Sequence, residues 1–237
     1  MVRQIIAMGG GGFSMEPENP LLDQYVLEQA NQAKPSICFM GTASGDAEGY
    51  IESFYTAFGK LNCQPSHLSL SRPTIADVES FILAQNIIYV GGGNTRNMLT
   101  LWKERGIDRI LRAAWEQGVI LTGLSAGAIC WFEAGVSDSN AGGLSSLPGL
   151  GLLPGSNCPH YDGETERRDG YHALLRSGDI GDGWALDDGV ALHYHGESIH
   201  TIVSSRPHAN AYQLRYNSNT EEVHEMMVEP EFLGTRI

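Results

Sequence analysis

A serine between two glycines, where a strand pattern meets a helix pattern, is the residue of this chain best suited to act as a nucleophile. The segment "LTGLSAGAICWF" (residues 121–132) starts as an apolar run and continues with small residues, and Ser125 lies at the junction. Gly123 to Gly127 fit G-x-S-x-G, a sharp strand-to-helix turn that exposes a serine hydroxyl. The same residues also suit an ordinary tight turn, so the interpretation depends on partners elsewhere in the chain.

Backbone donors for a developing oxyanion are predicted close to this serine. The N–H of Ala126 follows Ser125 directly and starts the helix pattern. A second donor is expected from "GGGN", because Gly92 and Gly93 have no side chain to keep a substrate away. Strand patterns precede both motifs, and the carboxyl ends of parallel strands form the ligand-binding edge of a sheet.

A serine nucleophile needs a general base, and the chain has eight histidines. His160 is the preferred candidate because it follows Pro159 in "SNCPHYDGE", a loop-like segment. His193 and His195 would share one face of a strand, which leaves a metal site as an alternative interpretation. No carboxylate or cysteine completes the ligand spacing there, so we expect no metal.

An orienting carboxylate would complete the site. The segment "WALDDGVAL" offers Asp187 and Asp188 where a strand pattern meets a turn, although Asp-Asp-Gly is also typical of a plain turn. The partners then follow in the order Ser, His, Asp. The α/β-hydrolases use the order Ser, Asp, His, so this order argues against an ordinary esterase or lipase of that fold.

Alternating strand and helix patterns in the first half of the chain would position these residues. Apolar strands between amphipathic helices predict an α/β fold with a doubly wound, mostly parallel sheet covered on both faces. The strand patterns occupy residues 4–8, 36–40, 86–90 and 119–123.

The second half has a different pattern. Residues 135–157 are rich in Gly, Ser and Pro and are expected to be mostly loop. Short alternating runs from residue 184 onward predict C-terminal antiparallel strands that extend or flank the same sheet. With no internal repeat or linker, we expect residues 1–237 to form one domain.

Composition narrows the classes of partner. A net charge of -13 argues against nucleic-acid binding, and no apolar run reaches the length of a signal peptide or a membrane helix. Four cysteines without a C-x-x-C pair predict free thiols and a cytoplasmic location. Residues 9–12, "GGGG", suggest nucleotide binding as an alternative, but the rest of a dinucleotide or P-loop motif is missing, so no cofactor is expected.

The motifs "YVGGGNT", "TGLSAGAICWFE", "CPHYDGE" and "LDDGVALHY" resemble, in this order, the peptidase E family of serine peptidases, whose relatives include aspartyl dipeptidases and cyanophycinases. The resemblance runs from "FMGTASGD" to about "SSRPHANAYQLRY". It implies a flavodoxin-like fold similar to class I glutamine amidotransferase domains. It also implies a triad of Ser125, His160 and Asp188, because the family's acid directly precedes the glycine, with Asp187 as the less favoured choice.

The resemblance further implies oxyanion donors at Ala126 and at Gly92 or Gly93, and a part for Asn94 in shaping the substrate site. One segment departs from it. Aspartyl dipeptidases of the family carry "GETRxxR", whereas this chain reads "GETERR", with Glu166 at the first arginine position. Arg167 or Arg168 could restore recognition of an acidic side chain, or both could pair with carboxylates at a helix start.

The favoured hypothesis is a cytoplasmic serine exopeptidase that acts on small peptides, with N-terminal Asp-X dipeptides as one candidate substrate class. An esterase or amidase for non-peptide substrates is the first alternative. The second is a non-enzymatic binding protein on the same scaffold. The expected partner is the peptide substrate, without nucleic acid or membrane, and the expected state is a monomer or a small homo-oligomer.

Overall fold

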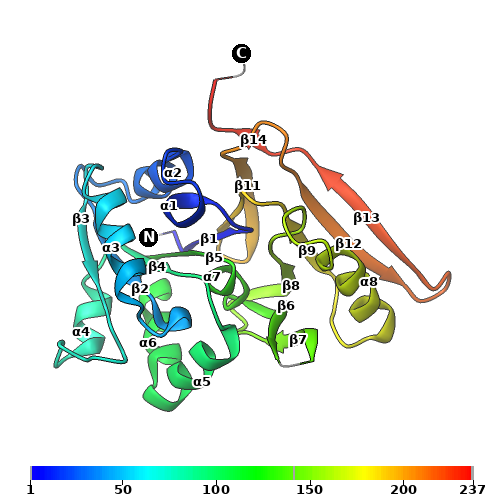
Figure 1. The fold of residues 1–237 in the computed structure, drawn as a ribbon, viewed down its shortest axis with the longest axis horizontal. Helices are drawn as coiled ribbons and strands as arrows, with labels where there is room; N and C mark the ends of the chain where they lie inside the picture. Colours follow the sequence, from blue (N-terminus) through cyan, green and yellow to red (C-terminus); the bar gives the residue numbers. More distant parts are fainter. Residues whose placement is uncertain (1, 141, 236–237) are drawn as a thin grey trace.

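A computed structural model of the protein describes residues 2–140 and 142–235. At its centre lies an eight-stranded sheet in the order β14-β11-β10-β1-β5-β4-β2-β3 (Figure 1). The pairings from β1 through β5, β4 and β2 to β3 are all parallel. These strands are β1 (Gln4–Met8), β2 (Ser36–Met40), β3 (Gln64–His67), β4 (Ile87–Val90) and β5 (Ile120–Leu124).

Helices cover both faces of the parallel strands, because successive strand residues point to opposite sides of a sheet. Ile6 of β1 belongs to the core that includes α1 to α3, whereas Ile5 belongs to the core that includes α4 to α7. The predicted doubly wound, mostly parallel sheet is thus confirmed. The helices are α1 (Gly12–Met15), α2 (Leu21–Gln29), the 3₁₀ helix η1 (Thr42–Ser44), α3 (Glu48–Phe58), α4 (Val78–Leu83), α5 (Thr95–Arg105), α6 (Ile107–Glu116), α7 (Ala126–Ile129) and α8 (Arg167–Ser177).

Three C-terminal strands extend the same sheet beyond β1, as the alternating sequence pattern predicts. Strand β10 (Val190–His195) pairs antiparallel with β1 and with β11 (Ser198–Ser204). The short β14 (Glu231–Phe232) pairs parallel with β11 at the edge. Because β10 lies next to β1, the residues that immediately precede β10 come close to the carboxyl end of β1.

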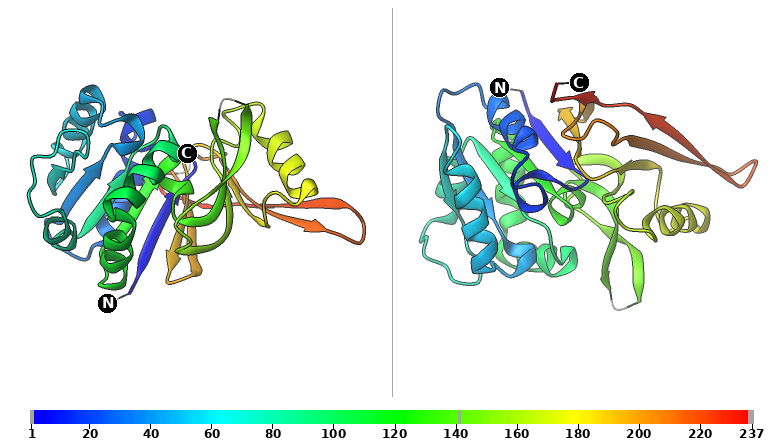
Figure 2. Two further views of the ribbon diagram at one scale, coloured as in Figure 1. Left: turned by 90° about the horizontal axis from the view of Figure 1, so that it is seen from below. Right: turned by 45° about the horizontal axis from the view of Figure 1, so that its top comes forward.

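A second, six-stranded sheet has the order β13-β12-β9-β8-β6-β7 and lies beside the first (Figure 2). Its β12–β13 hairpin projects away from the central sheet (Figures 1 and 2). The strands are β6 (Phe132–Asn140), β7 (Gly143–Pro148), β8 (Leu153–Cys158), β9 (Gly183–Leu186), β12 (Ala211–Asn217) and β13 (Glu222–Val228).

One expectation about the second half of the chain is therefore wrong. Residues 135–157 are mostly strand rather than loop, because their ladders and a few buried side chains, such as Val136 and Leu147, outweigh the turn-forming composition. Strands β9, β12 and β13 belong to the sheet beside the central one, since they pair with β8 and with each other.

Within residues 2–140 and 142–235, none of the helices combines the length and the apolar character that crossing a bilayer requires.

Candidate active site

Ser125 lies at the turn between β5 and α7 with φ 55° and ψ −115°, a conformation that costs energy for any residue other than glycine. The flanking glycines explain how the turn fits. A Cβ on Gly123 or on Gly127 would overlap the carbonyl oxygen of Val90 at the end of β4. The serine is thus strained, partly exposed and held between two sterically required glycines. The nucleophile elbow itself stays a prediction.

His160 follows β8 and also has a positive φ, 55°. Its N–H donates to the carbonyl of Gly9 at 3.1 Å, while the N–H of Ser125 donates to the carbonyl of Met8 at 3.2 Å. Met8 and Gly9 are consecutive residues at the carboxyl end of β1. One strand end therefore holds the backbones of the two predicted catalytic residues, which are 35 positions apart in the sequence.

The side chain of His160 contacts Asp188. Its Nδ1 lies 2.7 Å from Oδ1 of the carboxylate, and the two side chains are only 12% and 10% exposed. The N–H of Asp188 in turn donates to Oδ1 of Asp162 at 2.8 Å. A carboxylate on Nδ1 favours the tautomer with the proton on that nitrogen, which leaves Nε2 as the basic nitrogen.

Gly10 makes room for this pair. A Cβ at Gly10 would overlap Oδ1 of Asp188 and lie 2.9 Å from Nδ1 of His160. At Gly9, a Cβ would lie 2.5 Å from the carbonyl oxygen of Asp187. The glycines after β1 thus serve close packing within the protein, and this accounts for "GGGG" without a nucleotide.

Asp187, the other candidate acid, has different partners. Its Oδ2 accepts the N–H of Asn210 at 2.9 Å, and its Oδ1 is buried without a partner among the described residues. Burial raises the pKa of Asp187 to about 6, against a lowering contribution from the Asn210 N–H. Of the two adjacent carboxylates, the one that contacts His160 is Asp188.

The "GGG" turn joins β4 to α5 beside the serine. A Cβ at Gly92 would lie 3.3 Å from Cβ of Ser125, and a Cβ at Gly93 would overlap the carbonyl of Ala43 in η1. Gly93 also has φ 137°, which disfavours other residues. The "GGGN" turn therefore touches the "GTASG" segment that follows β2 (residues 41–45), and it also reaches the serine turn.

The N–H groups near the serine are not equivalent. That of Gly92 donates to the hydroxyl of Tyr50 at 3.2 Å. Within the described residues, the N–H groups of Gly93 and Ala126 have no acceptor in the protein. Sequence reasoning did not single out Tyr50, because one tyrosine in an amphipathic helix gives no signal of its own.

Asn94 caps α5. Its Oδ1 accepts the N–H of Asn97 at 2.9 Å, and its own N–H donates to the carbonyl of Ala43 at 2.8 Å. The side chain thereby fixes the start of the helix that follows the "GGG" turn. A direct part for Asn94 in substrate binding stays a prediction.

Both arginines of "GETERR" are bound to protein groups. Arg167 is buried, with Nε 2.6 Å from Oε2 of Glu164 and Nη1 2.8 Å from the carbonyl of Val136. Arg168 pairs with Glu225, and its guanidinium lies over Tyr161 and Tyr212 at 4.5 and 4.9 Å from the ring centroids. The predicted substrate contact of Arg167 would require these bonds to break.

The strand histidines form a cluster of a different kind. The buried His193 is 2.7 Å from the Tyr25 hydroxyl through Nδ1 and 2.9 Å from Oε1 of Gln4 through Nε2, so both ring nitrogens have protein partners. His195 and His200 stack with their centroids 3.8 Å apart. In the part of the chain that the structure describes, no group of three or more His, Cys, Asp or Glu side chains is arranged to hold a metal ion.

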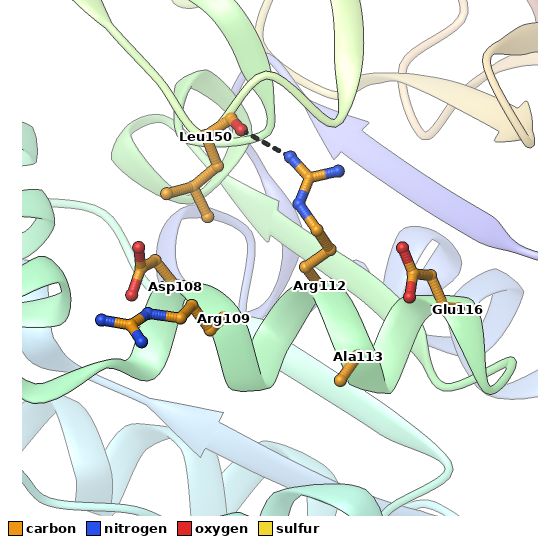
Figure 3. A pocket seen from close by; sticks show the side chains of 6 residues that line it. All are labelled: Asp108, Arg109, Arg112, Ala113, Glu116 and Leu150. Carbon is orange, nitrogen blue, oxygen red and sulfur yellow. Dashed lines mark hydrogen bonds between the residues drawn. The ribbon is translucent and has the colours of Figure 1, made fainter.

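A cavity of about 210 Å³ lies on α6 (Figure 3). Charged side chains of both signs line it, and Arg112 donates to the carbonyl of Leu150 at 3.1 Å. Asp108 and Leu150 also line an adjacent cavity of about 460 Å³. Neither cavity includes Ser125, His160 or Asp188.

The proteins and the family model that this chain resembles are named as peptidases. The model of peptidase family S51 matches residues 5–202. The protein named uncharacterized peptidase YgaJ of Bacillus subtilis (strain 168) is 54% identical over 98% of this chain and 100% of its own length. A Listeria monocytogenes protein, also named as an uncharacterized peptidase, is 26% identical over 60% of this chain and 72% of its own length.

Among solved structures, a peptidase from an acI-B1 Actinobacterium superposes with a TM-score of 0.66. It is 20% identical to this chain and covers 97% of it, with 95% of its own chain matched. At this identity the likeness concerns the fold.

Proposed function

The chain belongs to peptidase family S51, and from this premise we propose that it is a serine exopeptidase that hydrolyses small peptides through Ser125, His160 and Asp188. The observation that carries the proposal is the 2.7 Å contact between His160 and Asp188 at the strand end that also holds the strained Ser125 turn. The restriction to small peptides with a free N-terminus rests on the resemblance of the four motifs to the peptidase E family.

In the first half of the proposed reaction, Oγ of Ser125 attacks the scissile carbonyl carbon while Nε2 of His160 takes the hydroxyl proton. Asp188 holds the imidazole through Nδ1 and stabilises the imidazolium that forms. The N–H groups of Ala126 and Gly93 donate to the oxyanion, and their lack of acceptors within residues 2–140 and 142–235 supports this assignment. His160 then gives its proton to the leaving amine, and the C–N bond breaks.

In the second half, His160 takes a proton from a water molecule that attacks the acyl-enzyme. The tetrahedral intermediate collapses, the bond to Oγ breaks, and Ser125 regains its proton from the imidazolium. Nothing beyond the chain's own groups and water is required for the atoms and protons to balance.

We further propose that an acidic N-terminal residue is not a requirement of the substrate. Arg167 is buried and bound to Glu164 and Val136, and Arg168 is held by Glu225 and two tyrosine rings. Freeing Arg167 would leave the buried carbonyl of Val136 without its partner. Freeing Arg168 would leave the partly buried carboxylate of Glu225 without its partner. Each loss costs free energy. Neutral dipeptides are therefore the favoured substrates.

A dipeptide panel beside p-nitrophenyl esters tests the proposal. Wild-type enzyme is expected to cleave Ala-X and Leu-X dipeptides, and Ser125→Ala is expected to remove that activity while the circular dichroism spectrum is unchanged. Cleavage of the esters without cleavage of any peptide would favour the esterase alternative. Full peptidase activity in Ser125→Ala would overturn the proposed mechanism.

A further inference from the structure

Tyr50 links α3 to the turn beside the proposed nucleophile. Its hydroxyl accepts the N–H of Gly92 at 3.2 Å. A Cβ at Gly91 would lie 2.9 Å from Cε1 of Tyr50, so the ring lies directly against the turn as well. The tyrosine thus contacts two consecutive residues of a segment that has no side chains of its own.

The ring of Tyr50 is held in place by other aromatic rings. It meets Phe39 of β2 edge to face, with centroids 5.0 Å apart, and Phe13 of α1 at 5.5 Å. Such contacts fix the direction of the ring and hence the position of its hydroxyl. The hydroxyl is therefore a fixed acceptor, because its ring is supported by a strand of the sheet and by a helix that covers the sheet.

The fixed hydroxyl of Tyr50 determines which N–H of the "GGG" turn is left free beside Ser125. Glycines have wide conformational freedom, so a run of three would not by itself fix the direction of an N–H. Tyr50 takes the N–H of Gly92, and the contact of Gly93 with Ala43 restrains the other side of the turn. Of the three glycine N–H groups, that of Gly93 is then left without an acceptor among the described residues.

We propose that Tyr50 is a positioning residue for the oxyanion site: its hydroxyl fixes the "GGG" turn so that Gly93, and not Gly92, presents its N–H to the substrate. The inference rests on the proposed function, since it concerns the donor that stabilises the intermediate on Ser125. Preorganised donors gain their effect because no reorganisation is needed when the charge develops.

The phenol is suited to this task because it stays neutral. Burial raises the pKa of Tyr50, with smaller opposing contributions from Ser14 and the Gly92 N–H and a raising contribution from the charge of Asp23. A neutral hydroxyl accepts the Gly92 N–H without adding a negative charge beside the developing oxyanion.

The variant Tyr50→Phe removes the hydroxyl and keeps the ring. Loss of one oxyanion donor costs about 10²–10³ in kcat in other serine peptidases, so loss of a group that only orients a donor is expected to lower kcat by at least about tenfold, with KM unchanged. Rates are divided by the amount of enzyme that a fluorophosphonate titrates, so that misfolded protein does not count.

Tyr55→Phe is the matched control. Tyr55 lies on the same helix, and its hydroxyl forms a hydrogen bond with Nδ1 of His67 at 2.8 Å. The control variant therefore also loses one tyrosine hydroxyl and one hydrogen bond, but not at the "GGG" turn. Its kcat and KM are expected to equal those of the wild type. A second readout is the affinity for a peptide aldehyde, which adds to Ser125 and carries an oxyanion. That affinity should fall in Tyr50→Phe by the same factor as kcat.

The outcomes are distinct. A Tyr50→Phe enzyme with the kcat and aldehyde affinity of Tyr55→Phe would overturn the role of Tyr50, and so would a change confined to KM. A wild-type protein that cleaves no peptide, or a Ser125→Ala variant that keeps its activity, would instead overturn the proposed function on which the inference rests.

Discussion

Nδ1 of His160 and Oδ1 of Asp188 lie 2.7 Å apart in a pair that is almost closed to solvent. The contact joins the loop after β8 to the turn before β10. The segments that precede and follow β9 in the sequence therefore meet at the carboxyl end of β1. Because the acid binds Nδ1, the opposite ring nitrogen is the one available for proton transfer.

Asp188→Asn is expected to lower kcat on the order of 10⁴-fold, because an amide in this position favours the wrong imidazole tautomer. Asp187→Asn should have little effect on kcat, since its carboxylate binds the N–H of Asn210 and does not contact His160. Steady-state kinetics on one neutral dipeptide compare the two. A larger loss in Asp187→Asn than in Asp188→Asn would contradict the assignment of the acid.

Gly10→Ala should inactivate the enzyme while the protein still folds. The added methyl group would overlap Oδ1 of Asp188 and crowd His160, although the backbone conformation of Gly10 does not itself require glycine. Gly49→Ala on α3 is the control, because its Cβ would meet no atom within 4 Å. Activity and thermal unfolding should separate the two variants, and an active Gly10→Ala enzyme would mean that the contact can shift without consequence.

The arginines of α8 are expected to support the structure rather than to select the substrate. In Arg168→Gln, the ion pair with Glu225 and the stacking on two tyrosines are lost, so the free energy of unfolding should fall. The ratio of kcat/KM for Asp-X to that for Ala-X should stay as in the wild type. A selective loss of Asp-X cleavage would instead assign Arg168 to an acidic subsite.

Asp23 makes stability depend on pH. It is buried on α2, and this burial, against smaller lowering contributions from Tyr89 and the Phe13 N–H, raises its pKa from 3.8 to about 7. A raised folded-state pKa stabilises the fold fully below the unfolded-state pKa, and that contribution is lost as the pH rises through about 7.

Asp23→Asn lacks this titration. Relative to the wild type, the variant should therefore gain up to about 4 kcal/mol in the free energy of unfolding between low and neutral pH. Urea unfolding at about pH 4 and about pH 8 measures the difference. A gap between variant and wild type that does not change with pH would show that Asp23 is ionised at little cost in the fold.

Much of the fold could be predicted from the sequence, because four of the parallel strands, β1, β2, β4 and β5, are buried on both faces and read as apolar runs. The serine turn and the "GGG" turn were also recognisable, since close approach to Val90 and to Ala43 leaves room only for glycine. Each of these features leaves its signal within one short segment of the sequence.

Features that depend on tertiary contacts left no such pattern. Strands β6 to β8 consist largely of small and polar residues, and their pairing partners stabilise them more than their propensity does. Asp187 and Asp188 are neighbours in the sequence, and only the three-dimensional arrangement distinguishes the one that contacts His160. Tyr50 likewise resembles any half-buried helix residue until Gly92 is placed against it.

Covalent labelling tests the central claim most directly. A fluorophosphonate reacts with a serine only when a general base activates it, so the native protein should take up one probe molecule on the peptide that carries Ser125. Mass spectrometry of the digested protein should find no adduct in Ser125→Ala and much slower labelling in Asp188→Asn. An unlabelled native protein, or an adduct that persists in Ser125→Ala, would contradict the account.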